Sequence, residues 1–310
     1  MSVGVKVFAP ASVANLACGY DILGLAINGP GDEIIAKQVD KPGVVISFIA
    51  GAKGKLPKEA RKNTAGMAAI KLLEFLGEEK IGIDLKIYKK MPFGSGLGSS
   101  AASAAAAVMA VNEVLKRPLT RRELLPFAVL GEQVADGAYH ADNVAPSLMG
   151  GIVFIRSNKT LDVHRIPVPK GLHVTVICPH IKVLTKDSRN ILGDMLRLDQ
   201  HVEQSGNLGG LILGLYNSNF DLIGRSLEDV VIEPQRAQLI PGFIEVKQQA
   251  LKQGALGCSI SGAGPSIFAL SSNNVIAENV GNAMKKVFKD LKIESDLFIS
   301  EVNQTGTYLI

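Results

Sequence analysis

Three glycines within five residues (Gly94, Gly96 and Gly98) constrain the fold of this chain more than any other feature of its sequence. Two serines follow them, and then comes the alanine-rich run 101–112, which contains neither glycine nor proline. Alanine favours a helix, whereas glycine accepts left-handed backbone and lets the chain approach a ligand closely. The pattern therefore predicts a strand, a glycine loop and then a helix that begins at the two serines.

The start of this predicted helix is suited to an anion. Free backbone N–H groups and the positive end of the helix dipole both attract negative charge there. A phosphate cradle is one interpretation of the stretch, and a glycine turn capped by serine is the other. The loop is not a P-loop, because no Gly-Lys-Ser/Thr closes it. It is not a dinucleotide-binding loop either, because no acidic residue ends a strand about 20 residues further on.

The bulk composition predicts a globular chain with room for two domains. It has 310 residues with 47% hydrophobic content, which is ample for a large core, although one large domain would also fit. The net charge of +4 comes from well-mixed signs. Such a mild, evenly spread charge argues against nucleic acid and is compatible with a small anionic ligand.

The three cysteines (Cys18, Cys178 and Cys258) are far apart and show neither metal-ligand spacing nor a disulfide framework. A reducing, cytoplasmic setting is the simple expectation. No signal peptide is visible, and the most apolar run, residues 101–111, is too short to span a membrane. We therefore expect no membrane association.

The stretch Pro-x-Gly-x-Gly-Leu-Gly-Ser-Ser-Ala at residues 92–101 resembles the nucleotide loop of the GHMP kinases, a family that includes galactokinases, homoserine kinases and mevalonate kinases. Residues 9–26 look like the N-terminal substrate segment of the homoserine kinases, and His-Ala-Asp-Asn-Val-Ala-Pro at residues 140–146 closely resembles another of their loops. Sugar-type and mevalonate-type members carry Gly-Lys/Arg and Gly-Glu-His in the N-terminal segment. This chain has Ala-Ser and Cys-Gly-Tyr in those places.

The resemblance covers nearly the whole chain and implies an α+β fold of two domains. These are an N-terminal α/β domain like domain 2 of ribosomal protein S5 and a C-terminal ferredoxin-like α/β sandwich. The composition changes at residues 168–171, so we expect a nucleotide-binding domain over residues 1–168 and a second domain over residues 169–310. The predicted order of strand, helix, strand, strand, helix, strand in the second half is itself ferredoxin-like.

The resemblance implies ATP binding by the glycine loop and Mg²⁺ binding nearby. Mg²⁺ that bridges nucleotide phosphates needs one or two hard oxygen ligands from protein. Glu132 would supply one and Ser100, or else Ser99, the other; the alternative for Glu132 is a solvated helix position. The expected ATP-binding residues are Asn63, Pro92, Phe93, Gly94, Ser95, Gly96, Leu97, Gly98, Ser99, Ser100, Ala101 and Ala102. On the sequence alone, Asn63 is better explained as the N-cap of a helix over residues 64–76.

The resemblance further implies L-homoserine as the substrate, a zwitterion with a terminal hydroxyl. Its ammonium needs an anion, for which Asp21 is the candidate, and its carboxylate fits a guanidinium from Arg189 or Arg236. The remaining expected substrate contacts are Asn15, His140, Asn143, Thr185 and Gly262. Turn chemistry could equally account for the N-terminal polar residues, and each arginine taken alone could be a solvated surface charge.

The implied reaction moves the γ-phosphoryl of ATP to the homoserine hydroxyl, which forms ADP and O-phospho-L-homoserine on the route to threonine. The expected catalytic residues are Asp142 and Asn143. Asp142 corresponds roughly to the aspartate that takes the hydroxyl proton in mevalonate-type members, but Ser12 replaces the lysine that accompanies it. Since phosphoryl transfer depends mainly on positioning and charge neutralisation, we expect a dedicated base to be weak or absent.

Two alternatives remain open at this point: another GHMP kinase that acts on mevalonate or a sugar, and a non-catalytic ligand-binding member of the same fold. The resemblance also suggests a homodimer.

Overall fold

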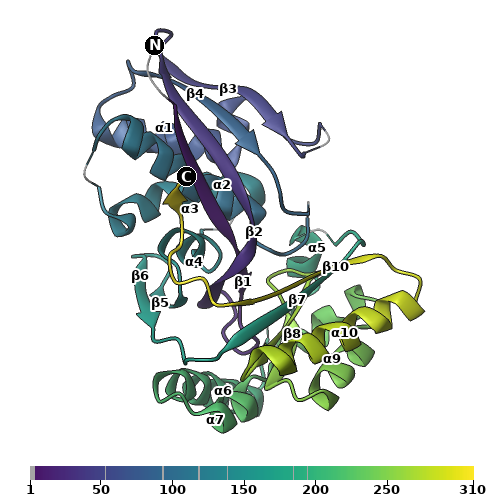
Figure 1. The fold of residues 1–310 in the computed structure, drawn as a ribbon. Coiled ribbons are helices and arrows are strands. Elements are labelled where there is room, and N and C mark those ends of the chain that lie inside the picture. The colour runs from purple at the N-terminus through teal and green to yellow at the C-terminus, as the bar shows by residue number, and fades with distance from the viewer. Residues whose placement is uncertain are drawn as a thin grey trace.

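The computed structural model describes residues 4–310, except residues 53, 93, 118, 138, 184 and 194 and the side chains of residues 135, 136, 185 and 186. Two sheets, each with helices packed against it, make up the described part of the chain (Figure 1). None of the described helices combines the length and the apolar character that crossing a membrane requires.

The first sheet is built around one long strand, β2, which pairs with β1, β4 and β5 along different parts of its length. The order is β11-β1-β2-β4-β3, with β5 and then β6 attached to the beginning of β2. All pairs are antiparallel except β3 with β4. The strands are β1 (Val5–Ala14), β2 (Leu23–Val39), β3 (Gly43–Ala50), β4 (Gly82–Tyr88), β5 (Ile152–Ser157), β6 (Asp162–Ile166) and β11 (Tyr308–Leu309).

Helices α1, α2 and α3 lie together against this sheet (Figure 1). Every residue of α2 from Ala101 to Asn112 is buried, because the helix contacts β1 and β2 as well as both other helices. Alanine fits this position since its small side chain lets four neighbours approach closely. The elements in this region are η1 (Ala60–Lys62), α1 (Thr64–Leu76), α2 (Ser99–Val114), α3 (Arg121–Asp136) and α4 (Val144–Met149).

The second sheet confirms the ferredoxin-like order that the sequence predicts. Its strands follow the order β10-β7-β9-β8, and each neighbouring pair is antiparallel. The framework consists of β7 (His173–Pro179), α9 (Phe243–Lys252), β8 (Gly257–Ile260), β9 (Ile267–Ser271), α10 (Asn274–Asp290) and β10 (Ser295–Glu301). The segment inserted between β7 and α9 contains α5 (Thr185–Asn190), α6 (Leu198–Tyr216), α7 (Phe220–Ser226), α8 (Glu233–Arg236) and η2 (Ala237–Leu239).

Both faces of the second sheet are buried. On β7, Val174 and Val176 join the large core that includes the first sheet, whereas Ile177 joins a smaller core with α9 and α10. On β9, Phe268 and Ala269 divide between the two cores in the same way. Because successive side chains of a strand point to opposite faces, the second sheet connects the two halves of the molecule.

The structure differs from the sequence-based expectation around the first two strands. The alternation of Val3, Val5 and Val7 predicts a strand that ends at Phe8, and residues 32–39 are predicted as the next strand. In the structure β1 continues to Ala14, and β2 begins at Leu23. Residues 9–14 are small and fully buried, so pairing with β2 outweighs their weak local preference. The polar composition of residues 137–143 leaves a water-facing loop open as an alternative, but the stretch leads directly into the buried helix α4.

The domain boundary predicted near residue 168 falls between β6 and β7. Strand β6 belongs to the first sheet and β7 to the second. The boundary stays a prediction, because it does not separate the two sheets completely. Strand β11 comes from the second half of the chain but pairs with β1 in the first sheet.

We expect Ala105→Leu to destabilise the protein, because the Ala105 side chain is fully buried in α2 and no space exists for three more carbon atoms. Overpacking of this kind costs about 1–3 kcal/mol, which urea denaturation would measure. The same substitution at Ala283, half-buried on α10, is the matched control and should cost clearly less. Equal costs at the two positions would contradict the tight packing of α2.

Candidate functional site

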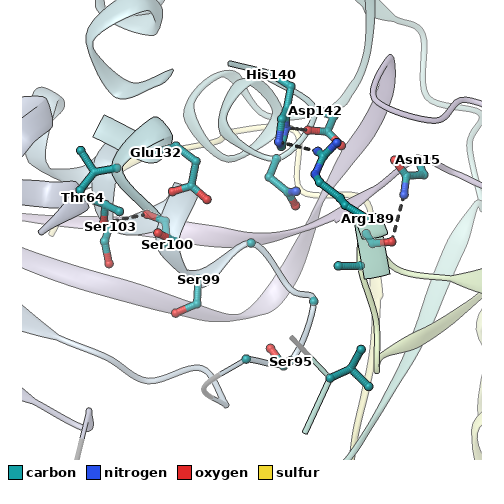
Figure 2. A pocket seen from close by; sticks show the side chains of 18 of the residues that line it. Asn15, Thr64, Ser95, Ser99, Ser100, Ser103, Glu132, His140, Asp142 and Arg189 are labelled. Carbon is teal, nitrogen blue, oxygen red and sulfur yellow. Dashed lines mark hydrogen bonds and ion pairs between the residues drawn. The ribbon is translucent and has the colours of Figure 1, made fainter. Parts of the chain in front are cut away.

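A single cavity of about 490 Å³ brings most of the predicted site residues together (Figure 2). Its volume lies in the range usual for small-molecule sites. The predicted residues that line it are Asn15, Asp21, Asn63, Gly94, Ser95, Gly96, Gly98, Ser99, Ser100, Glu132, His140, Asp142, Asn143, Arg189, Arg236 and Gly262.

The glycine loop enters helix α2 through a left-handed residue, Gly98, whose φ is +64°. A Cβ atom there would lie 2.1 Å from Ser12 Oγ and 2.8 Å from Asn143 Oδ1. Those two atoms also bond each other, since Ser12 Oγ donates to Asn143 Oδ1 at 2.8 Å. Only glycine therefore lets the loop, the end of β1 and the beginning of α4 meet at this point.

A second glycine loop, residues 261–266, packs against the first. Ser261 Oγ donates to Gly96 O at 2.8 Å, and a Cβ atom on Gly96 would lie 2.7 Å from the carbonyl oxygens of Ser261 and Gly264. The backbone N–H of Ser266 also donates to Ser95 O at 3.1 Å. The second domain thus holds the shape of the loop that the first domain supplies.

A buried ion pair lies beneath the first turn of α2. Lys89 Nζ bonds the Asp32 carboxylate and also donates to Ser99 O and to Ser103 Oγ, each at 2.7 Å. Asp32 is completely buried and Lys89 is 8% exposed. The Ser99 hydroxyl donates to the same carboxylate at 3.0 Å. This network fixes where the helix begins, and Lys89 and Ser103 also line the cavity.

The network bears on the predicted metal ligands. The Ser99 hydroxyl is bonded to Asp32, whereas Ser100 lines the cavity together with Glu132, which reaches it from the last turns of α3 (Figure 2). A carboxylate and a hydroxyl are the hard oxygen donors that Mg²⁺ accepts. These side chains therefore fit a metal ion beside the loop, with Ser100 favoured over Ser99.

The N-terminal segment between β1 and β2 is held in unusual backbone conformations. Asn15 has a φ of +74° and Asp21 a φ of +59°, which few residues other than glycine adopt. Asn15 Oδ1 accepts from Asp21 N at 3.1 Å, and Asn15 Nδ2 donates to Gly262 O at 3.0 Å. Asn158 Nδ2 donates to Asp21 O at 2.9 Å. Because its backbone is fixed on both sides, Asp21 presents its carboxylate at a defined place in the cavity.

Arg236 lies buried at the inner end of the cavity, only 3% exposed. Its guanidinium donates to Ser188 O and Gly262 O, each at 2.9 Å, and stacks 5.1 Å from the centre of the Tyr20 ring. Among the residues that the structure describes, no ion pair involves Arg236. Burial lowers the pKa of Arg236 from its ordinary value, yet a guanidinium stays charged at neutral pH. A buried cation without a carboxylate partner favours an anionic ligand.

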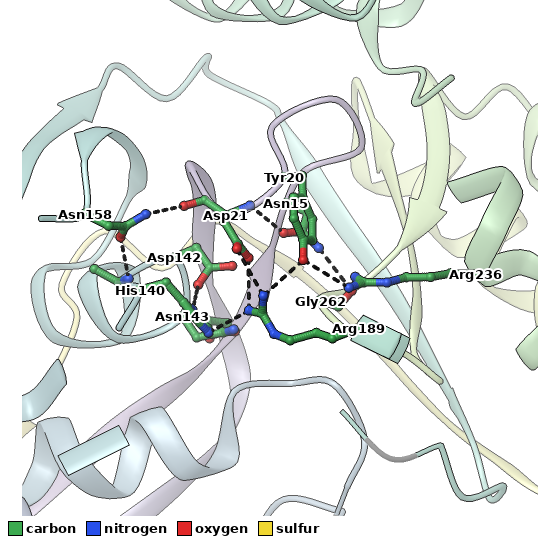
Figure 3. Close-up of polar contacts among 12 residues, drawn as sticks. Asn15, Tyr20, Asp21, His140, Asp142, Asn143, Asn158, Arg189, Arg236 and Gly262 are labelled. Carbon is green, nitrogen blue, oxygen red and sulfur yellow. Dashed lines mark hydrogen bonds and ion pairs between the residues drawn. The ribbon is translucent and has the colours of Figure 1, made fainter. Parts of the chain in front are cut away.

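Arg189 and His140 complete this end of the cavity (Figure 3). Arg189 Nη2 donates to His140 Nε2 at 2.8 Å, and His140 Nδ1 lies 2.6 Å from Asp142 Oδ1. Since a guanidinium can only donate, Nε2 must accept, so His140 is neutral and its Nδ1–H donates to Asp142. Asp142 is 2% exposed, unlike a residue of the solvated loop that its sequence alone could suggest.

Asp21, His140 and Asp142 lie close enough together to hold a metal ion. Arg189 already places a cation among them, because its guanidinium bonds both Asp21 and His140. The cluster is therefore better explained as a hydrogen-bonded charge network around Arg189 than as a metal centre.

Some predicted residues do not line the cavity. Leu97, Ala101 and Ala102 are fully buried behind the loop, and Pro92 lies beside it. Phe93 and the Thr185 side chain lie outside the described residues, so their predicted contacts stay predictions. Asn63 lines the cavity and also caps α1, accepting from Ala65 N and Gly66 N as its sequence predicted.

The structure places in the cavity several side chains that the sequence analysis missed, and two of them contact the charged groups of the site. Tyr20 sits between the two arginines: its hydroxyl accepts from Arg189 Nη1 at 3.1 Å and from Arg236 Nη2 at 3.5 Å. Burial is the largest cause of the raised pKa of Tyr20, so the hydroxyl keeps its proton. Lys89 was the other. The one available signal for Lys89 was its position just before a glycine loop that leads into a helix.

Comparison with known proteins agrees with this geometry. Residues 63–151 match the GHMP kinases N terminal domain, and residues 211–290 match the GHMP kinases C terminal domain. A homoserine kinase of Chlorobium phaeobacteroides strain BS1 is 48% identical over 98% of each chain, and one of Xanthomonas campestris is 38% identical over 98% of this chain and 94% of its own. The crystal structure of a homoserine kinase from Cytophaga hutchinsonii is 53% identical, covers 100% of this chain and 98% of its own, and superposes with a TM-score of 0.97.

We expect Gly98→Ala to weaken ATP binding and destabilise the protein. The left-handed backbone at this position costs an alanine about 1–2 kcal/mol, and the clash with Ser12 and Asn143 adds to that. Gly77→Ala is the matched control, because Gly77 has a φ of +68° with nothing near its missing Cβ. Urea denaturation and ATP titration should show a loss of ATP affinity at Gly98 only. Unchanged affinity there would mean that the close approach does not shape the loop.

Proposed function

The chain belongs to the GHMP kinases, and from that membership we propose that it is a homoserine kinase, which transfers the γ-phosphoryl group of ATP to the side-chain hydroxyl of L-homoserine. The products are ADP and O-phospho-L-homoserine, an intermediate of threonine biosynthesis. One observation carries the proposal: the same cavity has a phosphate loop at one end and an aspartate with two arginines at the other.

The nucleotide end acts through backbone groups and through the helix. The left-handed glycines of the loop present N–H groups to phosphate, and the N-terminus of α2 adds its dipole. Lys89 lies at the cavity wall below Ser99 and adds a positive charge that Asp32 partly offsets. Asn63, at the start of α1, would lie beside the base.

We propose Ser100 and Glu132 as the protein ligands of Mg²⁺ at this end of the cavity. Once bound, the ion would offset the charge of the triphosphate during transfer. Both side chains line the cavity and both offer hard oxygen atoms, which supports the proposal.

The other end is suited to a small zwitterion. Its α-carboxylate would meet Arg236 and Arg189, and its ammonium would meet Asp21. Asn143 lies between the two ends of the cavity. Its Oδ1 accepts a hydrogen bond from Ser12 Oγ, so its amide N–H₂ would be available to donate to the homoserine hydroxyl. His140, Asn15 and Gly262 border the same space, and Thr185 is retained as a predicted contact.

Positioning explains the transfer without a strong base. Asp142 accepts a hydrogen bond from neutral His140, so its carboxylate orients that ring instead of standing free to take a proton. The hydroxyl proton would pass to the transferred phosphoryl group or to solvent as the new bond forms. Phosphoryl transfer tolerates this because its transition state requires little help at the attacking oxygen.

We further propose a cytoplasmic setting and a homodimer. The three cysteines are buried free thiols with no disulfide among them, which supports a reducing setting. Helix α6 exposes several apolar side chains, including Leu198, Val202 and Tyr216, which would suit contact with a second copy.

The direct test is ADP release from ATP and Mg²⁺ with L-homoserine, run beside mevalonate, galactose, L-serine and no acceptor. We expect turnover with homoserine alone and its loss when EDTA removes Mg²⁺. Turnover with another alcohol would reassign the acceptor end of the cavity. ATP binding without any turnover would favour a non-catalytic member of the fold.

We expect Asp142→Asn to lose less than about 100-fold in the single-turnover rate, because an asparagine oxygen still accepts from His140 Nδ1–H. A loss near 10⁴-fold, the upper range for general base catalysis, would instead identify Asp142 as the base. Rapid quench measurement of phosphohomoserine formation would decide whether Asp142 orients His140 or acts as the base. Asp187→Asn, at an exposed position on α5, is the control and should leave the rate unchanged.

A further inference from the structure

The second glycine loop, residues 261–266, links the second sheet to both ends of the cavity. It joins β8 to β9, and the residues that flank it, Ile260 and Ile267, pair with each other and are buried. The loop is closed on itself by a hydrogen bond from Ser261 N to Ser266 O at 2.8 Å. Because its base is fixed in the sheet, contacts on one side of the loop are held in place relative to contacts on the other side.

Ser261 attaches this loop to the first glycine loop, residues 94–98. Its hydroxyl donates to Gly96 O at 2.8 Å. The approach is close, since a Cβ atom on Gly96 would lie 2.7 Å from Ser261 O. Ser261 is fully buried and is not among the residues that line the cavity. Its hydroxyl therefore acts on the first glycine loop and not on a ligand.

The next two residues of the second glycine loop attach to the amino-acid end of the cavity. Gly262 O accepts from Asn15 Nδ2 at 3.0 Å and from Arg236 Nη1 at 2.9 Å (Figure 3). Ala263 O accepts from Ser188 Oγ, on α5, at 2.7 Å. One carbonyl thus fixes two of the side chains proposed to meet the amino acid, and the next carbonyl fixes helix α5.

The contacts with the two ends of the cavity are separated by a single peptide bond. Consecutive Cα atoms lie about 3.8 Å apart, so a displacement at Ser261 passes to Gly262 with little loss. Transfer requires the reacting atoms to lie about 3–3.5 Å apart and in line. An error in the position of one end relative to the other therefore slows the reaction, even where each end keeps its own shape.

We propose that Ser261 is a positioning residue for phosphoryl transfer, because its hydroxyl keeps the first glycine loop aligned with the two carbonyl groups that hold the amino-acid end. This inference rests on the proposed function. Without the hydroxyl, ATP and homoserine each still bind, since their own contacts are unchanged. The γ-phosphoryl group and the acceptor hydroxyl then reach the productive geometry less often, so the loss falls on the transfer step.

The test is Ser261→Ala, in which the rate of transfer and the affinities are measured separately. We expect the single-turnover rate with both substrates saturating, followed by rapid quench, to fall about 10- to 100-fold, the upper value being that for a misplacement of about 1 Å. Calorimetry gives the dissociation constants of a non-hydrolysable ATP analogue and of L-homoserine. Each should stay within about three-fold of the wild-type value, near the lower end of the range for one lost hydrogen bond.

Ser271→Ala is the matched control. Ser271 is also fully buried, but it ends β9 away from the loop, and its hydroxyl has no hydrogen-bond partner in the described part of the chain. Its replacement should leave the rate and both affinities unchanged. Ser261→Cys, which keeps a side chain of similar size with a much weaker donor, repeats the test if urea denaturation shows that Ser261→Ala folds poorly.

The two levels of inference fail separately. Absence of homoserine turnover in the wild-type protein would refute the proposed function. Wild-type turnover together with an unchanged single-turnover rate in Ser261→Ala would refute only the positioning role. A slower rate accompanied by an equal loss of affinity for the ATP analogue would refute it as well, because the hydroxyl would then shape the first glycine loop and not its alignment with the amino-acid end.

Discussion

The close approach of the Ser12 and Asn143 side chains to the backbone of Gly98 is the constraint on which the site depends. The end of β1, the start of α4 and the glycine loop meet there with no room for a single carbon atom. Each segment has a part in the proposed function: the loop would face phosphate, and the other two lead into the residues proposed to face the amino acid. A reaction that joins two substrates needs its parts held within a fraction of an ångström. Here the backbone of Gly98 packs directly against two side chains that bond each other, and this contact provides that precision.

The charges of the site are organised in two different ways. Beneath the loop, Lys89 and Asp32 form a buried pair whose hydrogen bonds are satisfied within the protein, so it serves as a fixed foundation. At the amino-acid end, Arg189 and Asp21 form a partly exposed pair with long contacts. Buried pairs of the first kind are strongly destabilised by the loss of one partner, whereas pairs of the second kind can exchange partners readily. One end of the cavity thus has a fixed ion pair, and the opposite end has an ion pair that can exchange partners.

Local chemistry explains which parts of the fold could be predicted from the sequence. Helix α1 has the bounds that its periodicity and Asn63 cap predicted. The sequence Thr-Arg-Arg-Glu at residues 120–123 also has the pattern of a capping box, and this capping box begins α3. Both signals depend on residues a few positions apart. The extension of β1 to Ala14 was missed because it depends on burial against β2. Small apolar residues show no local pattern that predicts such a strand.

The same reasoning applies to the site. The glycine loop and the polar stretch around His140 are compact signals, so the sequence placed them in one site. The Lys89–Asp32 pair joins residues 57 positions apart, and Tyr20 meets Arg236 across 216 positions. No local pattern distinguishes such a lysine or tyrosine from a solvated one. Partners of this kind become visible only when the fold brings their elements together.

The return of the chain to its first sheet has a consequence for biosynthesis. Strand β11 covers the edge of β1, and Arg121 on α3 bonds the carbonyls of Thr305 and Thr307. The ribosome makes these residues after all the strands and helices of the ferredoxin-like unit. The nascent nucleotide domain therefore waits with an open strand edge while the later unit folds beside it. Such an edge is a place where chaperones or neighbouring nascent chains bind, so the order of synthesis and the order of completion are opposite for the two halves.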